Sequence, residues 1–348
     1  MSSNKAAWLN KAGTPLEVGE APLPVPGPNE IVIQNAAIAI NPLDCHMQDH
    51  GVFVQQFPAI FGCDVAGIVS EVGTEAQGRF KKGDRVLGHA INLVTGKPQD
   101  GAYALYTAVP ADKAAILPDS IPFTQGVVAA FALEAAVCAL SVKTPGIAMP
   151  GVPTPALGLP YPSLQSVSSN KTLIVYGGSS SVGSMTTQLA AAAGIKVIAI
   201  ASERNFDLCK SCGASEVFDY HESGFVEKVI AAASSAQGRE FVGIFDAIST
   251  QETYDIDLKI LAKLGGGHLA AVHPPPPEVP ENVKAGMIFA VNDVATPVWK
   301  EYVTPALESG KLKCLPPPTI VGKGLEYVNE ALAKSKAGVS ATKLVVEL

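Results

Sequence analysis

The stretch Thr172–Ser202 (TLIVYGGSSSVGSMTTQLAAAAGIKVIAIAS) constrains the fold of this chain more than any other. An apolar, partly β-branched run from Leu173 to Tyr176 predicts a strand that is buried on both faces. Two glycines and three serines follow, and apolar residues then repeat at helical spacing as far as Gly194, where a helix would end. A second apolar strand comes next. This order predicts a βαβ unit and therefore a parallel sheet.

The glycine turn between the first strand and the helix suits a phosphate group. Backbone N–H groups and the helix dipole both favour an anion at a helix N-terminus. The full G-x-G-x-x-G fingerprint is absent, because two serines separate Gly178 from Gly183. The alternative is a structural βαβ corner that binds no ligand. The residues expected to hold a pyrophosphate are Gly178, Ser179, Ser180, Ser181 and Val182.

The end of the second strand indicates which dinucleotide is bound. NAD-binding units place an acidic residue there, on the ribose 2′-hydroxyl. This strand ends at Ser202, and Glu203, Arg204 and Asn205 follow it. Glu203 keeps NAD open as an alternative. Ser202, Arg204 and Lys210 suit a 2′-phosphate better, so the sequence favours NADPH.

Length and composition indicate a folded protein of two domains. The chain has 348 residues, 47% of them hydrophobic and 16% charged, and a net charge of −7 that argues against a nucleic-acid partner. No apolar segment is long and uninterrupted enough to predict a signal peptide or a membrane span, so we expect a cytoplasmic protein. The pair Cys209 and Cys212 is expected to be two buried, reduced thiols rather than a metal site.

The rest of the chain divides into a β-rich part and an alternating part. Strands are predicted at 31–40, 63–72, 85–89 and 101–109, a loop after residue 40, and a helix at 123–142. Prolines recur through Pro145–Pro162, which we expect to be irregular, an ordered surface loop or an insertion. The functional alternative is a lid or a partner-docking loop. Strands and helices then alternate, with a strand at 286–291 that could pair across a dimer. The terminal strand, 343–348, is expected to return to the first domain.

These features resemble the medium-chain dehydrogenase/reductase superfamily over essentially the whole chain. The segments that carry the resemblance are NPLD (41–44), FGCDVAGIVSEVG (61–73), KKGDRVLG (81–88), GAYALYTAV (101–109), YGGSSSVG (176–183), FDLCKSCGASEVFDY (206–220) and KLVVEL (343–348). Within the superfamily, YGGSSSVG and the stretch 205–214 are most similar to the fungal zinc-free enoyl reductases that act in trans with polyketide synthases.

The resemblance implies an α/β fold, with a Rossmann doubly wound parallel sheet and a GroES-like, mostly-β barrel domain. The GroES-like catalytic domain would comprise residues 1–130, completed by 311–348, and the Rossmann domain residues 131–310. It implies NADPH as cofactor. The residues that would hold it are Gly178, Ser179, Ser180, Ser181, Val182, Ser202, Arg204, Asn205, Lys210 and, at a strand end, Tyr220. It further assigns Asn41, Asp44 and Lys343 to cofactor binding.

The resemblance also bears on metal and on proton transfer. Zinc members carry cysteine and His-Glu ligands in segments that match 41–44 and 62–64, where this chain has Asn41, Cys63 and Asp64. A catalytic zinc needs about three protein ligands, so no metal is expected. Relatives typically have lysine at the position of His46, within a pattern that reads NPLDCHM here. His46 is therefore either a proton donor or merely a wall of the pocket.

The activity that the resemblance implies is NADPH-dependent reduction of an activated carbon–carbon double bond, in a small-molecule or carrier-bound enone. A carbonyl or quinone reductase is the related alternative. A redox-silent isomerase, cyclase or NADPH-binding protein is the alternative from another class, since fold does not fix function. A polyketide synthase is a candidate partner, a membrane is not, and the chain could be a monomer or a homodimer.

Overall fold

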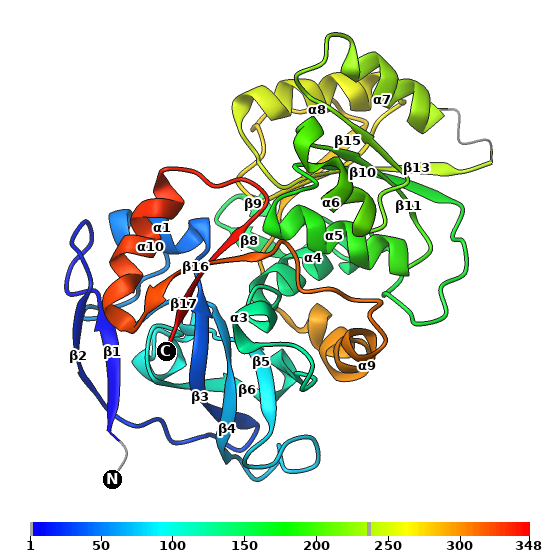
Figure 1. The fold of residues 1–348 in the computed structure, drawn as a ribbon. Helices are drawn as coiled ribbons and strands as arrows, with labels where there is room; N and C mark the ends of the chain where they lie inside the picture. Colours follow the sequence, from blue (N-terminus) through cyan, green and yellow to red (C-terminus); the bar gives the residue numbers. More distant parts are fainter. Residues whose placement is uncertain (1–2, 235–237) are drawn as a thin grey trace. The chain divides into compact units, whose positions relative to one another are not determined.

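The computed structural model describes residues 3–234 and 238–348, which form two compact units (Figure 1). Each unit has its own sheet and its own set of helices. Unit 1 runs to Phe131 and adds Trp299–Glu308 and Pro317–Leu348, and unit 2 consists of Ala132–Val298 and Ser309–Pro316.

Two segments belong to a different unit from the one the sequence predicted. Residues 311–316 were predicted in the GroES-like domain, whereas their contacts place them in unit 2. Trp299–Glu308 was predicted in the Rossmann domain, whereas its contacts place it in unit 1. Trp299 is fully buried, and its carbonyl accepts a hydrogen bond from Arg79. The Thr304 hydroxyl donates to the carbonyl of Ile116 at 3.0 Å. These contacts to the β-rich part of the chain could not be read from local sequence.

Unit 2 is built on a six-stranded parallel sheet with the strand order β12-β11-β10-β13-β14-β15. The chain runs outward from β10 to β12 and then returns to the other side of β10, which confirms the predicted doubly wound sheet. Its elements are α4 (Ala130–Ser141), β8 (Ile147–Met149), β9 (Val152–Pro153), β10 (Lys171–Tyr176), α5 (Ser181–Ala192), β11 (Lys196–Ile200), α6 (Phe206–Ser211), β12 (Glu216–Phe218), α7 (Phe225–Ser234), β13 (Glu240–Asp246), α8 (Gln251–Lys263), β14 (Gly267–Ala271) and β15 (Val283–Met287).

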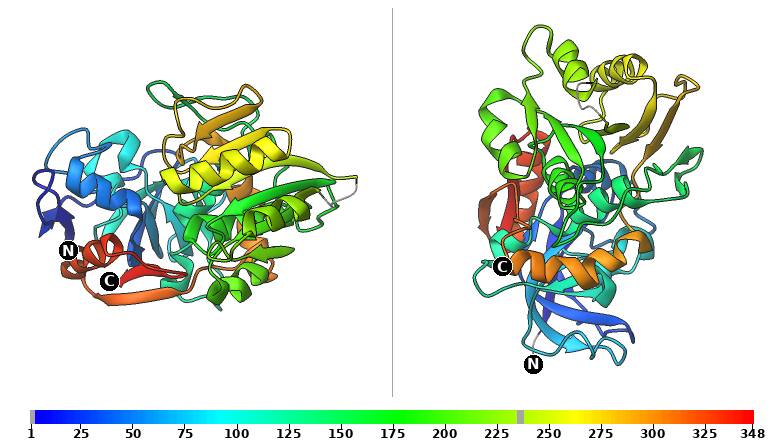
Figure 2. Two further views of the ribbon diagram at one scale, coloured as in Figure 1. Left: turned by 90° about the horizontal axis from the view of Figure 1, so that it is seen from above. Right: turned by 90° about the vertical axis from the view of Figure 1, so that its right-hand side faces the viewer.

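Helices cover both faces of this sheet (Figure 2). The side chains of β11 alternate between the faces: Ile198 and Ile200 join the cluster that contains Val229 of α7 and Leu261 of α8. Ala199 and Ala201 point the other way and pack with Cys209 of α6. Small side chains on that second face allow the backbone of the glycine turn to lie close to the sheet.

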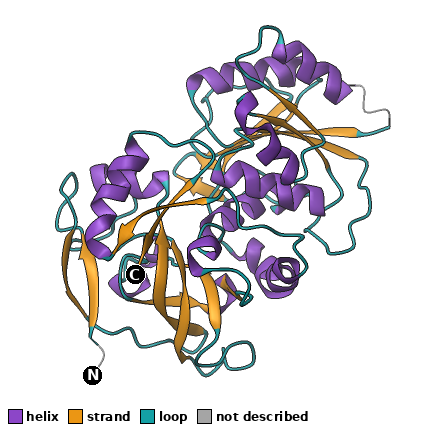
Figure 3. Cartoon of the chain, in the orientation of Figure 1, coloured by secondary structure: helices purple, strands orange, loops and turns teal. Residues whose placement is uncertain are grey.

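Unit 1 contains a second sheet with β3 as its central strand (Figure 3). The order is β16-β17-β3-β4-β5-β7, and β6 also pairs with β3. Antiparallel pairing of β17 with β3 confirms that the C-terminal strand returns to the first domain. The elements are β1 (Asn4–Trp8), β2 (Glu17–Ala21), β3 (Glu30–Ala39), α1 (Pro42–His50), β4 (Asp64–Val72), β5 (Arg85–His89), α2 (Asn92–Thr95), β6 (Tyr106–Pro110), β7 (Ala114–Ile116), α3 (Phe123–Gly126), α9 (Val303–Glu308), β16 (Pro318–Lys323), α10 (Val328–Lys336) and β17 (Lys343–Glu347).

The segment after β3 is a helix, α1, and the prediction of a loop there is wrong. Asn41 is extended and precedes Pro42, which occupies the first helical turn, where a missing N–H is tolerated. The Asp44 carboxylate accepts a hydrogen bond from the backbone N–H of Asn41 at 2.7 Å. Gly51 ends the helix with a φ of +67°. Asn-Pro therefore starts a helix here and does not form a loop.

The proline-rich segment contains a small hairpin, so the prediction that it has no regular structure is wrong for part of its length. Strands β8 and β9 pair antiparallel across Pro150 and Gly151. Gly151 has a φ of +78°, as the third position of a type II turn requires when proline precedes it. The following residues, 154–162, carry no helix or strand.

Three other boundaries differ from the sequence prediction. The strand expected at 101–109 starts only at Tyr106, because the segment before it bonds to the loop at 59–62, as in the hydrogen bond from Tyr103 N–H to the Phe61 carbonyl. The helix expected at 123–142 is interrupted between α3 and α4. The strand expected at 286–291 is β15, which begins three residues earlier and lies at an edge of its sheet.

One described stretch, Phe123–Ser141, is long and apolar enough to cross a membrane by length and composition alone. Its apolar window is 78% buried within the fold, as in the core helices of many proteins that do not span membranes. The six cysteines are free and buried, which confirms the buried thiols expected at Cys209 and Cys212.

Candidate functional site

The turn after β10 places backbone, rather than side chains, next to the start of α5. Gly177 has a φ of +72°. A Cβ added to Gly178 would lie 2.9 Å from the Cβ of Ala199, and one added to Gly183 would lie 2.2 Å from the carbonyl oxygen of Gly177. All three positions therefore require glycine. Such crowding is typical of turns whose backbone approaches a bound pyrophosphate.

Serines occupy the start of α5. Ser180 is the N-cap, and its hydroxyl accepts a hydrogen bond from the Gly183 N–H at 3.0 Å. The Ser181 hydroxyl oxygen is buried and has no hydrogen-bond partner among the described residues. A buried polar atom without a partner is costly, and the first helical turn also leaves N–H groups without intrahelical partners. This combination fits an anion such as a pyrophosphate.

The ends of β10, β11 and β12 lie at one edge of the sheet. The N–H of Gly178 donates to the carbonyl of Ile200, the last residue of β11, at 3.0 Å. The N–H of Ala201 donates to the carbonyl of Phe218, the last residue of β12, also at 3.0 Å. The Asn205 amide donates to the Ser179 hydroxyl at 3.1 Å. The structure therefore brings together the serines of the turn and the segment after β11, as the sequence predicted.

Two cations follow this edge without partners. Arg204 and Lys210 are exposed, and neither makes an ion pair or a side-chain hydrogen bond with any residue that the structure describes. Ser202 is half-buried, whereas Glu203 is exposed like the two cations. The cations are thus available to an anionic ligand, but Glu203 stands between them and the end of the strand in the sequence.

Tyr220 follows β12 at the same edge. Its side chain is 42% exposed, and its ring lies 4.0 Å from the ring of His221. An exposed aromatic ring can stack on a flat ligand. Contact of Tyr220 with the adenosine end of a cofactor stays a prediction.

Sequence reasoning missed the loop after β13. The buried carboxylate of Asp246 accepts hydrogen bonds from the N–H groups of Ile248 and Ser249, at 2.8 and 2.9 Å, and from the Thr253 hydroxyl at 2.5 Å. The side chain of Ile248 packs on Gly177, so this loop borders the glycine turn. The available signal was an aspartate at the end of an apolar strand, followed by Ser-Thr.

A second buried acid, Asp257, lies on α8 near this loop. Burial raises its pKa well above the usual value, and the neighbouring charge of Asp246 raises it further. Burial therefore favours the neutral, protonated form of Asp257 over a second negative charge beside Asp246. This helps to keep the edge of the sheet compatible with an anionic ligand.

Unit 1 contains a buried polar network at the starts and ends of its strands. Asn41 follows β3, Asp64 begins β4 and Lys343 begins β17. The Asn41 amide donates to Asp64 Oδ2 at 2.8 Å, and the Lys343 ammonium lies 3.1 Å from the same oxygen. The ammonium also donates to Asn41 Oδ1. The N–H of Phe131 donates to Asp64 Oδ1 at 2.6 Å. Asn41 and Lys343, which the resemblance assigned to the cofactor, are thus bonded to each other.

Asp44 extends this network towards Tyr103. Its Oδ2 accepts hydrogen bonds from the Asn41 N–H and, at 2.8 Å, from the Tyr103 hydroxyl. Its other oxygen has no partner among the described residues. Burial raises the pKa of Asp44 to about 7, although the hydrogen bonds from Asn41 and Tyr103 and the charge of Lys343 oppose the rise. Asp44 consequently changes charge near neutral pH.

His46 lies on the other face of α1. Its side chain is exposed and its ring stacks on that of His50, with 6.3 Å between the centroids. Asp44, Cys45 and Met47 form the buried face of the same helix. The structure does not bring His46 to the buried network, and its role as a proton donor stays a prediction.

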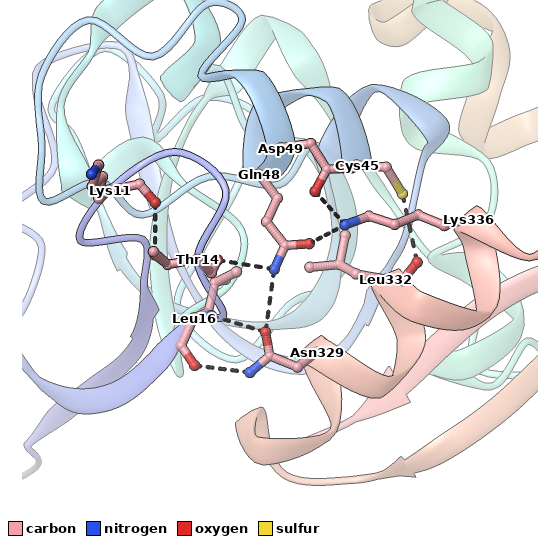
Figure 4. A network of polar contacts seen from close by, with 9 residues as sticks. All are labelled: Lys11, Thr14, Leu16, Cys45, Gln48, Asp49, Asn329, Leu332 and Lys336. Atoms are coloured by element: carbon pink, nitrogen blue, oxygen red, sulfur yellow. Dashed lines mark hydrogen bonds and ion pairs between the residues drawn. The ribbon is translucent and has the colours of Figure 1, made fainter.

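Contacts with α10 fix the orientation of α1 (Figure 4). The Lys336 ammonium donates to Gln48 Oε1 at 2.8 Å and pairs with Asp49. The Cys45 thiol donates to the carbonyl of Leu332 at 3.7 Å. α1 is thus held at its start by the Asp44 side chain and along its length by α10.

Comparison with known proteins assigns the family. The profile described as alcohol dehydrogenase GroES-like domain matches residues 27–119, and the profile described as zinc-binding dehydrogenase matches residues 181–295. Dehydrogenase orsE of Emericella nidulans is 71% identical over 350 residues and is aligned over the whole of both chains. The chain belongs to the medium-chain dehydrogenase/reductase superfamily. Trans-enoyl reductase himH of Aspergillus japonicus is 38% identical over 352 residues, which cover 99% of this chain and 97% of that one.

A solved structure supports the fold. A mycobacterial protein in complex with NADPH has a TM-score of 0.71 and 22% sequence identity, with all of both chains covered. The chain is therefore an oxidoreductase of this superfamily with a Rossmann sheet and a GroES-like domain, and a nicotinamide cofactor is typical of the family.

Proposed function

We propose that this protein is an NADPH-dependent reductase of an activated carbon–carbon double bond and works by hydride transfer without zinc. The observation that supports NADPH is the pair of exposed, unpartnered cations, Arg204 and Lys210, beyond the glycine turn. A ribose 2′-phosphate would accept charge-assisted hydrogen bonds from both, whereas a 2′-hydroxyl would leave them unused.

The similarity to trans-enoyl reductase himH supports a double bond conjugated to a carbonyl as the reacting group. When bound, a reduced nicotinamide supplies a hydride, which would go to the β-carbon of such a substrate. A proton must then reach the α-carbon or the oxygen. His46 is the proposed source, since an exposed imidazole can donate a proton from a ring nitrogen. Ser181 and the N–H groups of the first turn of α5 would bind the pyrophosphate, and Gly178, which has no side chain, would leave room for it.

The residues present do not fit the zinc ion that the family description implies. A catalytic zinc takes about three protein ligands. Among the described residues there is no group of three or more His, Cys, Asp or Glu side chains that could hold a metal. Both oxygens of Asp64 already accept hydrogen bonds, from Phe131 and from Asn41. No step of the proposed reaction passes through a metal.

The cofactor is tested by measuring the dissociation constants of NADPH and NADH for the parent protein and for Arg204→Ala and Lys210→Ala. We expect NADPH to bind at least tenfold more tightly than NADH, and each substitution to remove most of that preference while leaving NADH affinity unchanged. Lys196→Ala is the matched control, because Lys196 pairs with Glu216 at 2.7 Å. Equal affinities, or tighter NADH, would mean that Glu203 binds the ribose.

The reaction is tested by following NADPH consumption with enones, quinones and thioester-bound enoyl chains, with mass spectrometry of the products. A gain of two hydrogens across the double bond of an enone or enoyl thioester supports the proposal. Consumption with quinones or simple carbonyls alone would replace it with the carbonyl/quinone reductase alternative. Tight NADPH binding with no turnover on any of these substrates would favour a redox-silent protein.

A further inference from the structure

Two opposite charges are buried together in unit 1, away from water. Asp64 is 0% exposed and Lys343 is 3% exposed. A buried charge is strongly unfavourable unless another group compensates it. The two residues are far apart in the sequence, and the pairing of β17 with β3 and of β3 with β4 brings them together. The pairing of Asp64 with Lys343 is therefore set by the strand order of the sheet and not by the conformation of a surface side chain.

The ammonium is bound as a small cation would be. Lys343 Nζ lies 3.1 Å from Asp64 Oδ2 and donates to Asn41 Oδ1. Asn41 is held in turn, because its amide donates to Asp64 and its backbone N–H to Asp44. An ammonium group has three N–H donors, and the third has no partner among the residues that the structure describes. The site thus contains an ammonium paired with one carboxylate, and the ammonium has one N–H donor still available.

The sulfur next to this charge is poorly suited to a metal. Cys63 precedes Asp64 and is buried. Burial raises the pKa of its thiol well above the usual value, and the charges of Asp44 and Asp64 raise it further. Metals bind the thiolate rather than the thiol. A neutral thiol, an amide and a carboxylate that already bears an ammonium do not form a zinc site.

We propose that the ammonium of Lys343 is the resident cation of the site formed by Asn41 and Asp64, and that it takes the place of a metal ion in this dehydrogenase. This inference rests on the zinc-free reaction proposed above and names the group that supplies the positive charge instead. Hydride addition to an enone places negative charge on the carbonyl oxygen, and a fixed positive charge in a water-poor site stabilises such a charge. Lys343 is then an electrostatic residue as well as part of the structure.

Chemical rescue tests the cation directly. Lys343→Ala removes three carbons and the ammonium, which n-propylammonium can replace. We expect the thermal midpoint of Lys343→Ala to fall by several degrees, and millimolar n-propylammonium to restore much of the loss. Neither n-propanol nor tetramethylammonium should do so, because the first lacks the charge and the second lacks N–H donors. Lys196→Ala, in a half-buried ion pair of unit 2, is the control and should show no amine-specific rescue.

A second comparison covers the case in which Lys343→Ala does not fold. Lys343→Met keeps an unbranched side chain that lacks only the terminal ammonium, and it leaves Asp64 uncompensated. Adding Asp64→Asn should then raise the thermal midpoint above that of Lys343→Met alone. If the double variant is less stable than the single one, or if n-propylammonium restores nothing in a folded Lys343→Ala, the ammonium is not the resident cation.

Metal binding by the parent protein is the third measurement. Parent protein titrated with Co²⁺ should show neither the visible bands of tetrahedral cobalt nor a thiolate charge-transfer band. One bound Co²⁺ per chain, with a band that Cys63→Ser abolishes, would overturn both this inference and the zinc-free reaction. None of these readouts uses NADPH turnover. Rescue by the amine together with no reduction of any enone would therefore refute the proposed substrate and leave the cation in place.

Discussion

Replacing Gly183 with alanine changes the cofactor cradle at its tightest point. The new Cβ would lie 2.2 Å from the carbonyl oxygen of Gly177, where an ordinary contact is 3.4 Å or more. The glycine turn and the first turn of α5 must therefore move apart by about 1 Å. The same movement weakens the cap in which the Gly183 N–H donates to the Ser180 hydroxyl at 3.0 Å. Loss of such a cap costs about 1 kcal/mol of stability.

A displacement of about 1 Å misaligns every N–H group that would face the pyrophosphate. We expect NADPH affinity to fall by about 10- to 100-fold, which corresponds to about 1.4–3 kcal/mol of binding free energy. Titration followed by the fluorescence of the reduced nicotinamide measures this loss, and thermal unfolding monitors the fold. Gly78→Ala is the matched control, because nothing lies within 4 Å of the Cβ position of Gly78. Parental NADPH affinity in a folded Gly183→Ala would refute a pyrophosphate at this turn.

Two further predictions concern α1. Burial raises the pKa of Asp44 from 3.8 to about 7, so between these pH values the folded state keeps a proton that the unfolded state loses. The resulting contribution to the free energy of unfolding is complete below about pH 4 and is lost as the pH rises to about 7. The unfolding free energy of the parent relative to Asp44→Asn should fall by up to about 1.4 kcal/mol per pH unit over that window, and a pH-independent difference in urea titrations would contradict the assignment. His46→Ala should lower turnover by about 10²-fold while NADPH affinity stays unchanged. Parental turnover in His46→Ala would make His46 a wall of the pocket.

The nucleotide side of the site could be predicted from the sequence because its parts lie close together along the chain. Gly177 and Gly183 lie within seven positions of each other and are in close contact, and β10 pairs with the next strand of the chain. Periodicity and glycine spacing report such local arrangements directly. The loop after β13 was missed because its approach to Gly177 depends on the strand order of the sheet, which no local pattern contains.

The helix α1 shows a different limit. Asn-Pro after a strand was interpreted as a break, although proline is favourable in the first turn of a helix. The deciding contact is the hydrogen bond from the Asn41 N–H to the Asp44 carboxylate, and the same carboxylate also accepts from Tyr103. That second contact spans 59 residues, so the sequence shows Asp44 as a good capping residue but not as a buried one.

The buried network of unit 1 is assembled from residues 41, 64, 103, 131 and 343, so spacing carries no signal for it. A physical constraint nevertheless exists in the sequence. Asp64 opens the strand DVAGIVSEV and Lys343 opens KLVVE, and both strands are too apolar to lie at the surface. A carboxylate at the start of a buried strand requires a donor or a cation, and a lysine at the start of another requires an acceptor. Two such residues in one β-rich domain satisfy each other, so the pairing of Asp64 with Lys343 follows from their shared burial once β17 is placed beside β3.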